Sequence, residues 1–366
     1  MTVNSHDQQQ TDLFDPVVPR ARLDPRFQII AEHPSQAPAR AMARRVFAAF
    51  VDRDGNFVEQ FQTTGFDQRT WELFLFAYLR DVGFSIEWAH ARPDFVCVKE
   101  DQSVVIEATT ANPTGGQAAP TTFEGLQRRS AETNDEMLRR IQHEMPIRLG
   151  SPLYSKLRER YWELEHVAGK PLVFAIESFA AEDALYFSDT GLAAYLYGLW
   201  ATPWRTSTGD LIVTSVPISE HRDRNKVIPS GFFNQPDADR VSAVLFANTG
   251  TMPKFGRMAV QEGIDSENVR MVRVGACYDH DRNASEPLEF AYEVADRPRE
   301  WGHRETWGEG MSMFHNPNAL HPIDESLFTD IAHHRLEGGR VTATIPPFHP
   351  FISQTRTLHV RGSPPR

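Results

Sequence analysis

The chain contains 366 residues with a mass of 41.6 kDa, long enough to bury a sizeable core in one large domain or two ordinary ones. Hydrophobic residues make up 40% of it and charged residues 24%, a balance that excludes a disordered or fibrous protein. The 38 basic and 49 acidic residues give a net charge of −11, which argues against a sequence-independent nucleic-acid coat protein. An enzyme that gathers carboxylates around metal ions stays compatible with this charge.

Apolar runs and cysteines restrict the class of protein further. No apolar run approaches the roughly 20 residues of a membrane helix, and residues 1–20 have no apolar core of a signal peptide. We therefore expect a cytoplasmic protein with no membrane partner. Cys97 and Cys277 lie far apart and form no CxxC motif, which argues against a zinc ribbon, a disulfide framework and a redox pair.

The first elements follow a polar segment. Residues 1–36 are rich in Gln, Asp, Pro and Arg without a sustained period, which predicts a flexible N-terminal arm. Residues 37–51 have the alanine content and apolar spacing of a helix, and residues 70–79 (TWELFLFAYL) predict a buried helix. Gly83 suits the left-handed conformation that ends such a helix.

The middle of the chain predicts an α/β core. In chain order, the next elements are a short strand, the two strands of a hairpin, a loop rich in Gly, Pro and Thr, two charged amphipathic helices and a buried apolar strand: 85–88, 94–98, 104–109, 112–122, 124–142, 153–164 and 171–176. This order predicts a mixed central sheet flanked by helices on its faces.

The second half of the chain has weaker patterns. A helix is expected at 191–199, strands at 211–216, 241–247 and 269–274, and a Pro-rich tail after them. No clear linker interrupts the chain. We therefore expect a single α/β domain over 37–366, with a core at about 68–178 and a C-terminal extension of the sheet over about 179–366.

Asp94 and Glu107 are predicted to be neighbours on the hairpin. A hairpin that turns between Glu100 and Asp101 pairs Asp94 with Glu107, and directly opposed residues have Cβ atoms about 4.5–5.5 Å apart on the same face of a sheet. Two opposed carboxylates repel each other unless a cation lies between them. Hard divalent ions such as Mg²⁺ take this kind of oxygen ligand. A four-residue loop would keep the same pairing, whereas a shift by one residue would separate the two side chains.

Glu72 is the only charged residue between Thr70 and Leu79, and its helical neighbours are apolar. A carboxylate on such a face loses solvation, which favours its protonated form unless a cation, either Arg69 or a metal, keeps it charged. Taken singly, each of these carboxylates has an ordinary structural interpretation, as a turn residue or a member of an ion pair. The occurrence of all three carboxylates in this order favours a functional site.

The segments RTWELFLFAYLRDVGF, RPDFVCV and VVIEATTANP together resemble the PD-(D/E)XK nuclease superfamily. Its signature is a helical Glu, a Pro-Asp on one strand, and a Glu or Asp two positions before a Lys on the next. The resemblance covers roughly residues 68–176. The segments AVLFANTGTMPKFGRM and MFHNPNALHP are similar to those of an uncharacterised bacterial branch, with ExT here in place of ExK.

This resemblance implies a restriction-endonuclease-like three-layer core and metal-dependent phosphodiester hydrolysis of nucleic acid, with Mg²⁺ or Mn²⁺ as cofactor. By the resemblance, Asp94 and Glu107 would be metal ligands, and Glu72 would be a direct or water-bridged one. The substrate would be DNA rather than RNA. The sequence leaves the oligomeric state open, a homodimer included.

The catalytic Lys of the signature falls on Thr109, which cannot carry a positive charge. Lys156 (in SPLYSKLRERYW) lies on a helix expected to pack beside the hairpin, and the superfamily is known to move its Lys in this way. A solvated surface Lys is the competing interpretation. Lys99 lies at the hairpin turn, at the far end from Glu107. Without a Lys, the chain would be a catalytically inactive nuclease-fold protein that acts as a nucleic-acid-binding or scaffold component.

Other signals are weaker. Six arginines on the charged helices are candidate phosphate contacts, although such helices are usually solvated: Arg128, Arg129, Arg139, Arg140, Arg158 and Arg160. GTMPKFGR lacks the ending of a phosphate loop and predicts a connection between a strand and a helix. Four histidines suggest a metal or HNH-type site, but their spacing matches no zinc pattern and Asn-Pro-Asn predicts a turn: His315, His321, His333 and His334.

Overall fold

The computed structural model describes residues 12–112, 133–179, 185, 187–281, 283–284 and 286–360. The helices are α1 (Pro25–Glu32), α2 (Ala37–Phe47), α3 (Phe57–Gln62), α4 (Phe66–Asp81), α6 (Asn134–Arg139), α7 (Met145–Arg158), α8 (Thr190–Tyr197) and α9 (Met252–Gln261). The strands of the largest sheet are β1 (Ser85–Glu87), β2 (Phe95–Lys99), β3 (Gln102–Ala111), β4 (Leu172–Ser178), β9 (Ala243–Ala247), β12 (Ser312–His315), β13 (Ala332–Glu337) and β14 (Arg340–Thr344).

This largest sheet is mixed, with its eight strands in the order β1-β2-β3-β4-β9-β12-β13-β14. Strands β3, β4 and β9 run parallel in its centre, and β2 and β12 join this centre antiparallel on either side. Every residue of β4 and β9 is buried, because helices cover both faces of a sheet whose central strands are almost wholly apolar. The expected mixed sheet with flanking helices is therefore confirmed.

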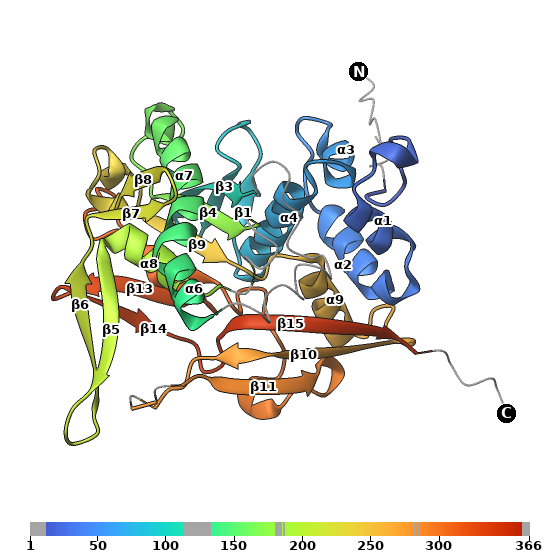
Figure 1. The fold of residues 1–366 in the computed structure, drawn as a ribbon. Coiled ribbons are helices and arrows are strands. Elements are labelled where there is room, and N and C mark those ends of the chain that lie inside the picture. The colour runs from blue at the N-terminus through green and yellow to red at the C-terminus, as the bar shows by residue number, and fades with distance from the viewer. Residues whose placement is uncertain are drawn as a thin grey trace.

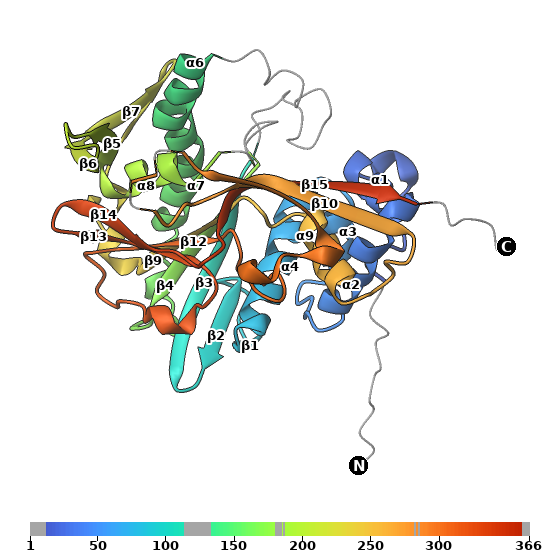
Figure 2. The ribbon, with the colours of Figure 1, turned by 90° about the horizontal axis from the view of Figure 1, so that it is seen from below.

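Two helical layers enclose the sheet (Figures 1 and 2). Helices α2, α4 and α9 pack on one face, where Val104 and Ile106 of β3 join their core, and the Trp71 indole of α4 donates a hydrogen bond to the carbonyl of Ala175 in β4 at 3.4 Å. Helices α7 and α8 pack on the other face with Val105. The alternation along β3 thus directs neighbouring side chains toward different helices.

The local predictions hold where periodicity was clear. The buried helix predicted at 70–79 is α4, and Gly83 beyond its end has φ +94°, in the left-handed region. GTMPKFGR leads from β9 into α9: Gly250 and Thr251 lie in the connection, and the rest of the motif forms the start of the helix. The loop predicted at 112–122 and the first half of the helix predicted at 124–142 lie almost wholly outside the described residues. None of the helices in the described ranges is long and apolar enough to cross a membrane.

The prediction of a flexible arm over 1–36 is wrong for the described residues 12–36. This segment contains α1, which begins at the capping residue Asp24, and it buries Phe14 and Phe27 in the same core as α4. The rings of Phe14, Phe27 and Phe61 lie 5.7–5.9 Å apart in stacked and edge-to-face pairs. Isolated large apolar residues among polar ones anchor the segment, and they leave no period to detect in the sequence.

The later strands extend the sheet only in part. The predicted strand at 241–247 is β9, which pairs with β4, but the strands predicted at 211–216 and 269–274 belong to smaller sheets. β5 (Leu199–Arg205) and β6 (Leu211–Pro217) form a separate hairpin, as do β7 (Glu220–Asp223) and β8 (Lys226–Pro229). β10 (Val269–Cys277) lies between β11 (Leu288–Glu293) and β15 (Pro350–His359). The Pro-rich tail therefore contains β11 to β15, because its prolines fall mostly between strands.

A buried charge network joins α9 to β10. Glu305 accepts hydrogen bonds from Lys254 at 2.6 Å and from Arg257 at 2.8–3.2 Å, and Arg273 Nη1 lies 3.3 Å away. Arg273 also pairs with Glu309. Lys254, Arg273 and Glu305 have no measurable exposure, so each charge depends on its partners for stabilisation.

Candidate active site

The hairpin of β2 and β3 has the predicted register. Val98 pairs with Ser103 and Val96 with Val105 across a two-residue turn at Glu100 and Asp101. The turn is shorter than a four-residue loop, because Glu100 adopts a left-handed φ of 56° and lets Lys99 pair with Gln102. The next pair beyond the end of β2 is Asp94 with Glu107.

Asp94 and Glu107 are held together at the open end of the hairpin. The backbone N–H of Asp94 donates to Glu107 Oε2 at 3.3 Å, and the backbone N–H of Ala108 donates to Asp94 Oδ2 at 2.8 Å. Because β2 begins at Phe95, these two backbone N–H groups donate to carboxylate oxygens, whereas N–H groups within paired strands donate to backbone carbonyls. The two carboxyls are therefore neighbours fixed by the hairpin itself.

Glu72 reaches the same region from α4. Its carboxylate accepts hydrogen bonds from Arg69 at 2.5 Å and from Gln68 at 2.9 Å, and only 4% of the residue is exposed. Arg69 is three residues earlier on the helix, so the cation expected beside Glu72 is confirmed. Gln60 in turn fixes Arg69 through hydrogen bonds at 2.5 and 2.8 Å.

Lys156 approaches Glu107 from α7. Its Nζ donates to Glu107 Oε1 at 2.5 Å, and its side chain is 28% exposed. The Tyr161 hydroxyl donates to the same oxygen at 2.8 Å. Tyr161 follows Arg160, whose left-handed φ of 52° reverses the chain just after α7. The structure thus places a Lys at the carboxylate pair, and this Lys comes from the helix that the sequence indicated.

Glu72, Asp94, Glu107 and Lys156 border one pocket with a volume of about 240 Å³. The segment between α2 and α3 contributes Arg53 and two further acidic residues to its lining. The lining residues that bear charge or an amide are Asp52, Arg53, Asp54, Asn56, Gln68, Arg69, Glu72, Asp94, Glu107 and Lys156. The pocket is therefore strongly polar and carries both signs of charge.

Burial and mutual repulsion perturb the acids in this pocket. Desolvation, followed by the nearby charges of Glu107 and Glu72, raises the pKa of Asp94 well above its ordinary value. Burial raises the pKa of Glu72, although Arg69 and Gln68 partly offset the effect. Burial and the Glu107 charge also raise the pKa of Tyr161, which keeps its hydroxyl protonated as a donor. An additional cation would relieve the repulsion between the carboxyls.

The donor set could hold one hard divalent cation. Asp94 and Glu107 offer carboxylate oxygens that Mg²⁺ and Mn²⁺ prefer, and the pocket leaves space for water. Among the described residues, no choice of one oxygen from each of Glu72, Asp94 and Glu107 brings all three within 4.8 Å of one another. The arrangement therefore offers Asp94 and Glu107 as the adjacent pair of carboxylates that a cation would bind.

A further acid, Glu177 of β4, does not line the pocket and lies close to Trp71 of α4. The residue is fully buried, and neither of its carboxyl oxygens forms a hydrogen bond of normal geometry with any described residue. Burial raises its pKa well above the ordinary value, and the backbone N–H of Gly250 acts in the opposite direction. A Cβ on Gly250 would lie 2.2 Å from Glu177 Oε2, so glycine is needed at this contact.

Thr109 and those predicted arginines that the structure describes do not line the pocket. Thr109 is buried at 8% exposure beside Ile176 of β4. Arg139 pairs with Asp223 at 2.8 Å and Arg160 with Glu163 at 2.7 Å, while Arg128 and Arg129 lie outside the described residues. The arginines that border the pocket are Arg53 and Arg69.

Sequence reasoning missed Tyr161, Gln68 and Arg53. A helical pattern gives no indication of Tyr161, because the residue lies after the chain reversal at Arg160. Gln68 had a detectable signal, since it precedes Glu72 by one helical turn. Arg53 donates to the carbonyl of Asp94 at 3.2 Å from a segment distant in sequence, and no local pattern predicts that contact.

Comparison with known proteins adds no family and no relative to this geometry. No family model matches the chain, and neither a curated protein nor a solved structure is significantly similar to it.

Proposed function

We propose that the pocket at Asp94 and Glu107 is the active site of a metal-dependent hydrolase that cleaves phosphodiester bonds in nucleic acid, on a restriction-endonuclease-like core. The observation that carries this proposal is the pairing of Asp94 with Glu107 at the open end of a hairpin, with Lys156 Nζ 2.5 Å from Glu107. Two adjacent acids, a cation and a polar cavity form the set that phosphodiester hydrolysis requires.

Asp94 and Glu107 would hold the cofactor, Mg²⁺ or Mn²⁺, which supplies a Lewis acid for the phosphate when bound. The hydrogen bonds from Ala108 to Asp94 and from Tyr161 to Glu107 orient the two carboxylates. Lys156 has further N–H groups beyond the one that Glu107 accepts, and these would orient the attacking water and stabilise negative charge on the phosphate.

Two arginines in the lining of the pocket support an anionic substrate. Arg53 and Arg69 border the cavity, and Arg69 is held by Gln60 and Glu72, which fixes its guanidinium in place. Arginine binds phosphate oxygens through a planar pair of donors. These two side chains would therefore position the phosphate backbone, with DNA as the expected substrate. The overall charge of −11 restricts binding to this local surface.

A second candidate function rests on Thr109 and on the present pairing of Lys156. Thr109 is buried and cannot supply a cation, and Lys156 already neutralises Glu107. A closed ion pair of this kind would suit a catalytically inactive protein of the nuclease fold that binds nucleic acid or acts as a scaffold.

The test is incubation of the purified chain with single- and double-stranded DNA and RNA in the presence of Mg²⁺ or Mn²⁺. We expect cleavage of DNA, reduced at least about 100-fold in Asp94→Asn, Glu107→Gln and Lys156→Met. Two matched controls keep their activity: Glu177→Gln, a buried acid outside the pocket, and Lys99→Met, a lysine at the far end of the hairpin.

The outcomes separate the two candidates. Binding of nucleic acid without cleavage at any metal concentration would support the inactive protein. Cleavage that persists in Asp94→Asn and Glu107→Gln would contradict the proposed site. Activity lost in both acid variants but retained in Lys156→Met would refute only the role of the lysine.

A further inference from the structure

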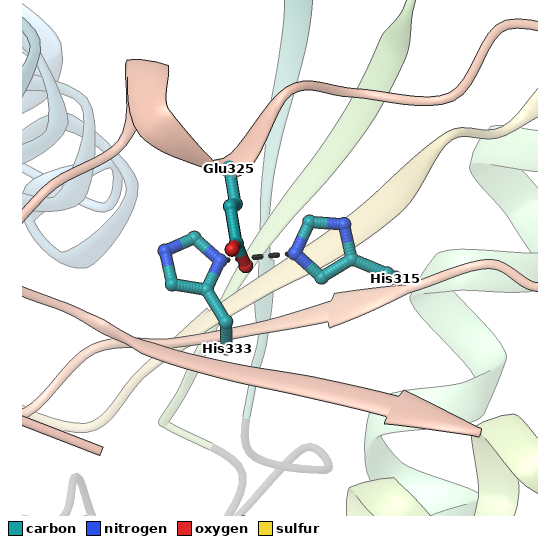
Figure 3. Close-up of side chains that lie close together, drawn as sticks. All are labelled: His315, Glu325 and His333. Carbon is teal, nitrogen blue, oxygen red and sulfur yellow. Dashed lines mark hydrogen bonds between the residues drawn. The ribbon is translucent and has the colours of Figure 1, made fainter. Parts of the chain in front are cut away.

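A second cluster of possible ligands lies at the other end of the large sheet, between β12 and β13. His315 ends β12, His333 lies in β13, and Glu325 lies on the short helical turn η11 (Glu325–Leu327) in the connection between them. Figure 3 shows the Glu325 carboxylate pointing between the two imidazole rings. One ligand atom from each of the three residues lies within 4.8 Å of the others.

The hydrogen bonds of His333 determine which of its two ring nitrogens carries the proton. Its Nε2 lies 2.8 Å from the carbonyl oxygen of Phe328, and because a carbonyl can only accept, this nitrogen carries the proton. In the neutral ring, Nδ1 therefore has a lone pair, which accepts a hydrogen bond from His315 Nε2 at 2.9 Å. A metal ion between the two rings would replace this proton, and His315 would then carry its proton on Nδ1. A carbonyl behind one imidazole nitrogen is the arrangement that orients histidine ligands in metal sites.

The spacing is close to that of a tetrahedral site. Two imidazole nitrogens bound to Zn²⁺ at about 2.05 Å are about 3.3 Å apart, so the rings would need to separate by only about 0.4 Å from their present 2.9 Å. Arg335 currently pairs with Glu325, and it would share this carboxylate with the metal. The Glu325 side chain is 49% exposed, which leaves a side open to water.

We propose that His315, His333 and Glu325 form a binding site for a divalent transition-metal ion of the Zn²⁺ type, with a fourth position open to water. Two nitrogen donors and one carboxylate favour Zn²⁺ or a similar ion over Mg²⁺, which prefers oxygen ligands. The site is therefore chemically distinct from the carboxylate pocket at Asp94.

Such an ion would fasten the connection between β12 and β13 to the sheet. η11 also touches the tip of the β2–β3 hairpin, where Lys99 Nζ donates to the carbonyl of Leu327 at 3.0 Å. The metal would thus fasten η11 to β12 and β13, two strands that are already paired in the large sheet.

The test begins with the full chain stripped of metal by a chelator and titrated with Zn²⁺ in a calorimeter. We expect one tight site per chain, and an increase in Tm of about 3 °C at a free Zn²⁺ concentration 100 times Kd. Co²⁺ bound in the same site should absorb visible light much more strongly than Co²⁺ in water, as a low-symmetry four-coordinate ion does.

The variants His315→Ala, His333→Ala and Glu325→Gln should weaken Zn²⁺ binding at least about 100-fold, more than the usual loss of an outer-shell partner. His321→Ala, in the same connection but outside the cluster, should bind as the wild type does, and so should Asp94→Asn. Glu325 is half exposed, so its substitution tests the site even if a histidine variant fails to fold. Unchanged affinity in the Glu325 variant and in every folded histidine variant, or no tight binding by the wild type, would overturn the proposal.

Discussion

Glu177→Gln should stabilise the protein, by an amount that grows with pH. Glu177 is fully buried with no hydrogen bond of normal geometry to the described residues, and burial raises the pKa of its carboxyl well above the ordinary value. Glutamine has nearly the same shape and cannot ionise. The substitution therefore removes the need to keep a proton on this carboxyl and changes little else.

The sign follows from the protons bound in each state. An unfolded glutamate releases its proton near pH 4.3, whereas the folded state keeps it to a higher pH. Between these two values the folded chain binds more protons than the unfolded one, so the free energy of unfolding of the wild type falls by up to about 1.4 kcal/mol per pH unit. The free energy of unfolding of the Glu177→Gln variant does not fall in this way as pH rises, because glutamine binds no proton in this range. Below about pH 4 both side chains are neutral, and the two proteins should differ by less than about 1 kcal/mol.

Urea unfolding followed by tryptophan fluorescence between pH 4 and 8 measures this difference. The control is Glu337→Gln, an exposed glutamate at the end of β13, which should change the free energy of unfolding by less than about 0.5 kcal/mol at every pH. A difference between Glu177→Gln and the wild type that is constant with pH, or that shrinks as pH rises, would refute the reasoning. It would show that Glu177 is ionised in the folded protein and has a cation for a partner.

Two further variants test the other buried charges. Asp94→Asn relieves repulsion among three carboxyls while an amide oxygen can still accept from Ala108, so the metal-free variant should resist urea at least as well as the wild type but gain nothing from Mg²⁺. The wild type should gain about 2.7 kcal/mol at 100 times Kd, and equal Mg²⁺ protection in both proteins would contradict this. Glu305→Ala leaves Lys254 and Arg257 buried without their main partner, and urea unfolding should show a loss of about 3–5 kcal/mol. A loss below about 1 kcal/mol would mean that water or another acid replaces Glu305.

The parts of the site that the sequence predicted depend on short-range geometry. The register of the hairpin follows from its turn and its alternation, so the sequence alone was enough to predict the pairing of Asp94 with Glu107. Arg69 beside Glu72 follows from helical spacing. Lys156 needed the resemblance as well, because a lysine on an amphipathic helix has no local mark of its function.

The parts that could not be predicted depend on the path of the chain between elements. His315 and His333 meet because β12 and β13 run parallel, joined by a long irregular connection whose course no periodicity describes. The packing of Phe14 against Phe61 brings together segments with no shared pattern. The two histidines and Phe14 are visible in the sequence as single residues, but their partners are known only from the tertiary contacts.

The order of strands in the large sheet is also their order along the chain, from β1 to β14. During synthesis, each of these strands can therefore add to the growing edge, and none must be inserted between strands already paired. Strand β4 is buried along its whole length in the finished sheet and has an unpaired edge until β9 has been made, and β9 waits equally long for β12. A nascent or truncated chain that ends before Ala243 thus presents an apolar, open strand edge, which is the form most prone to pair with another copy.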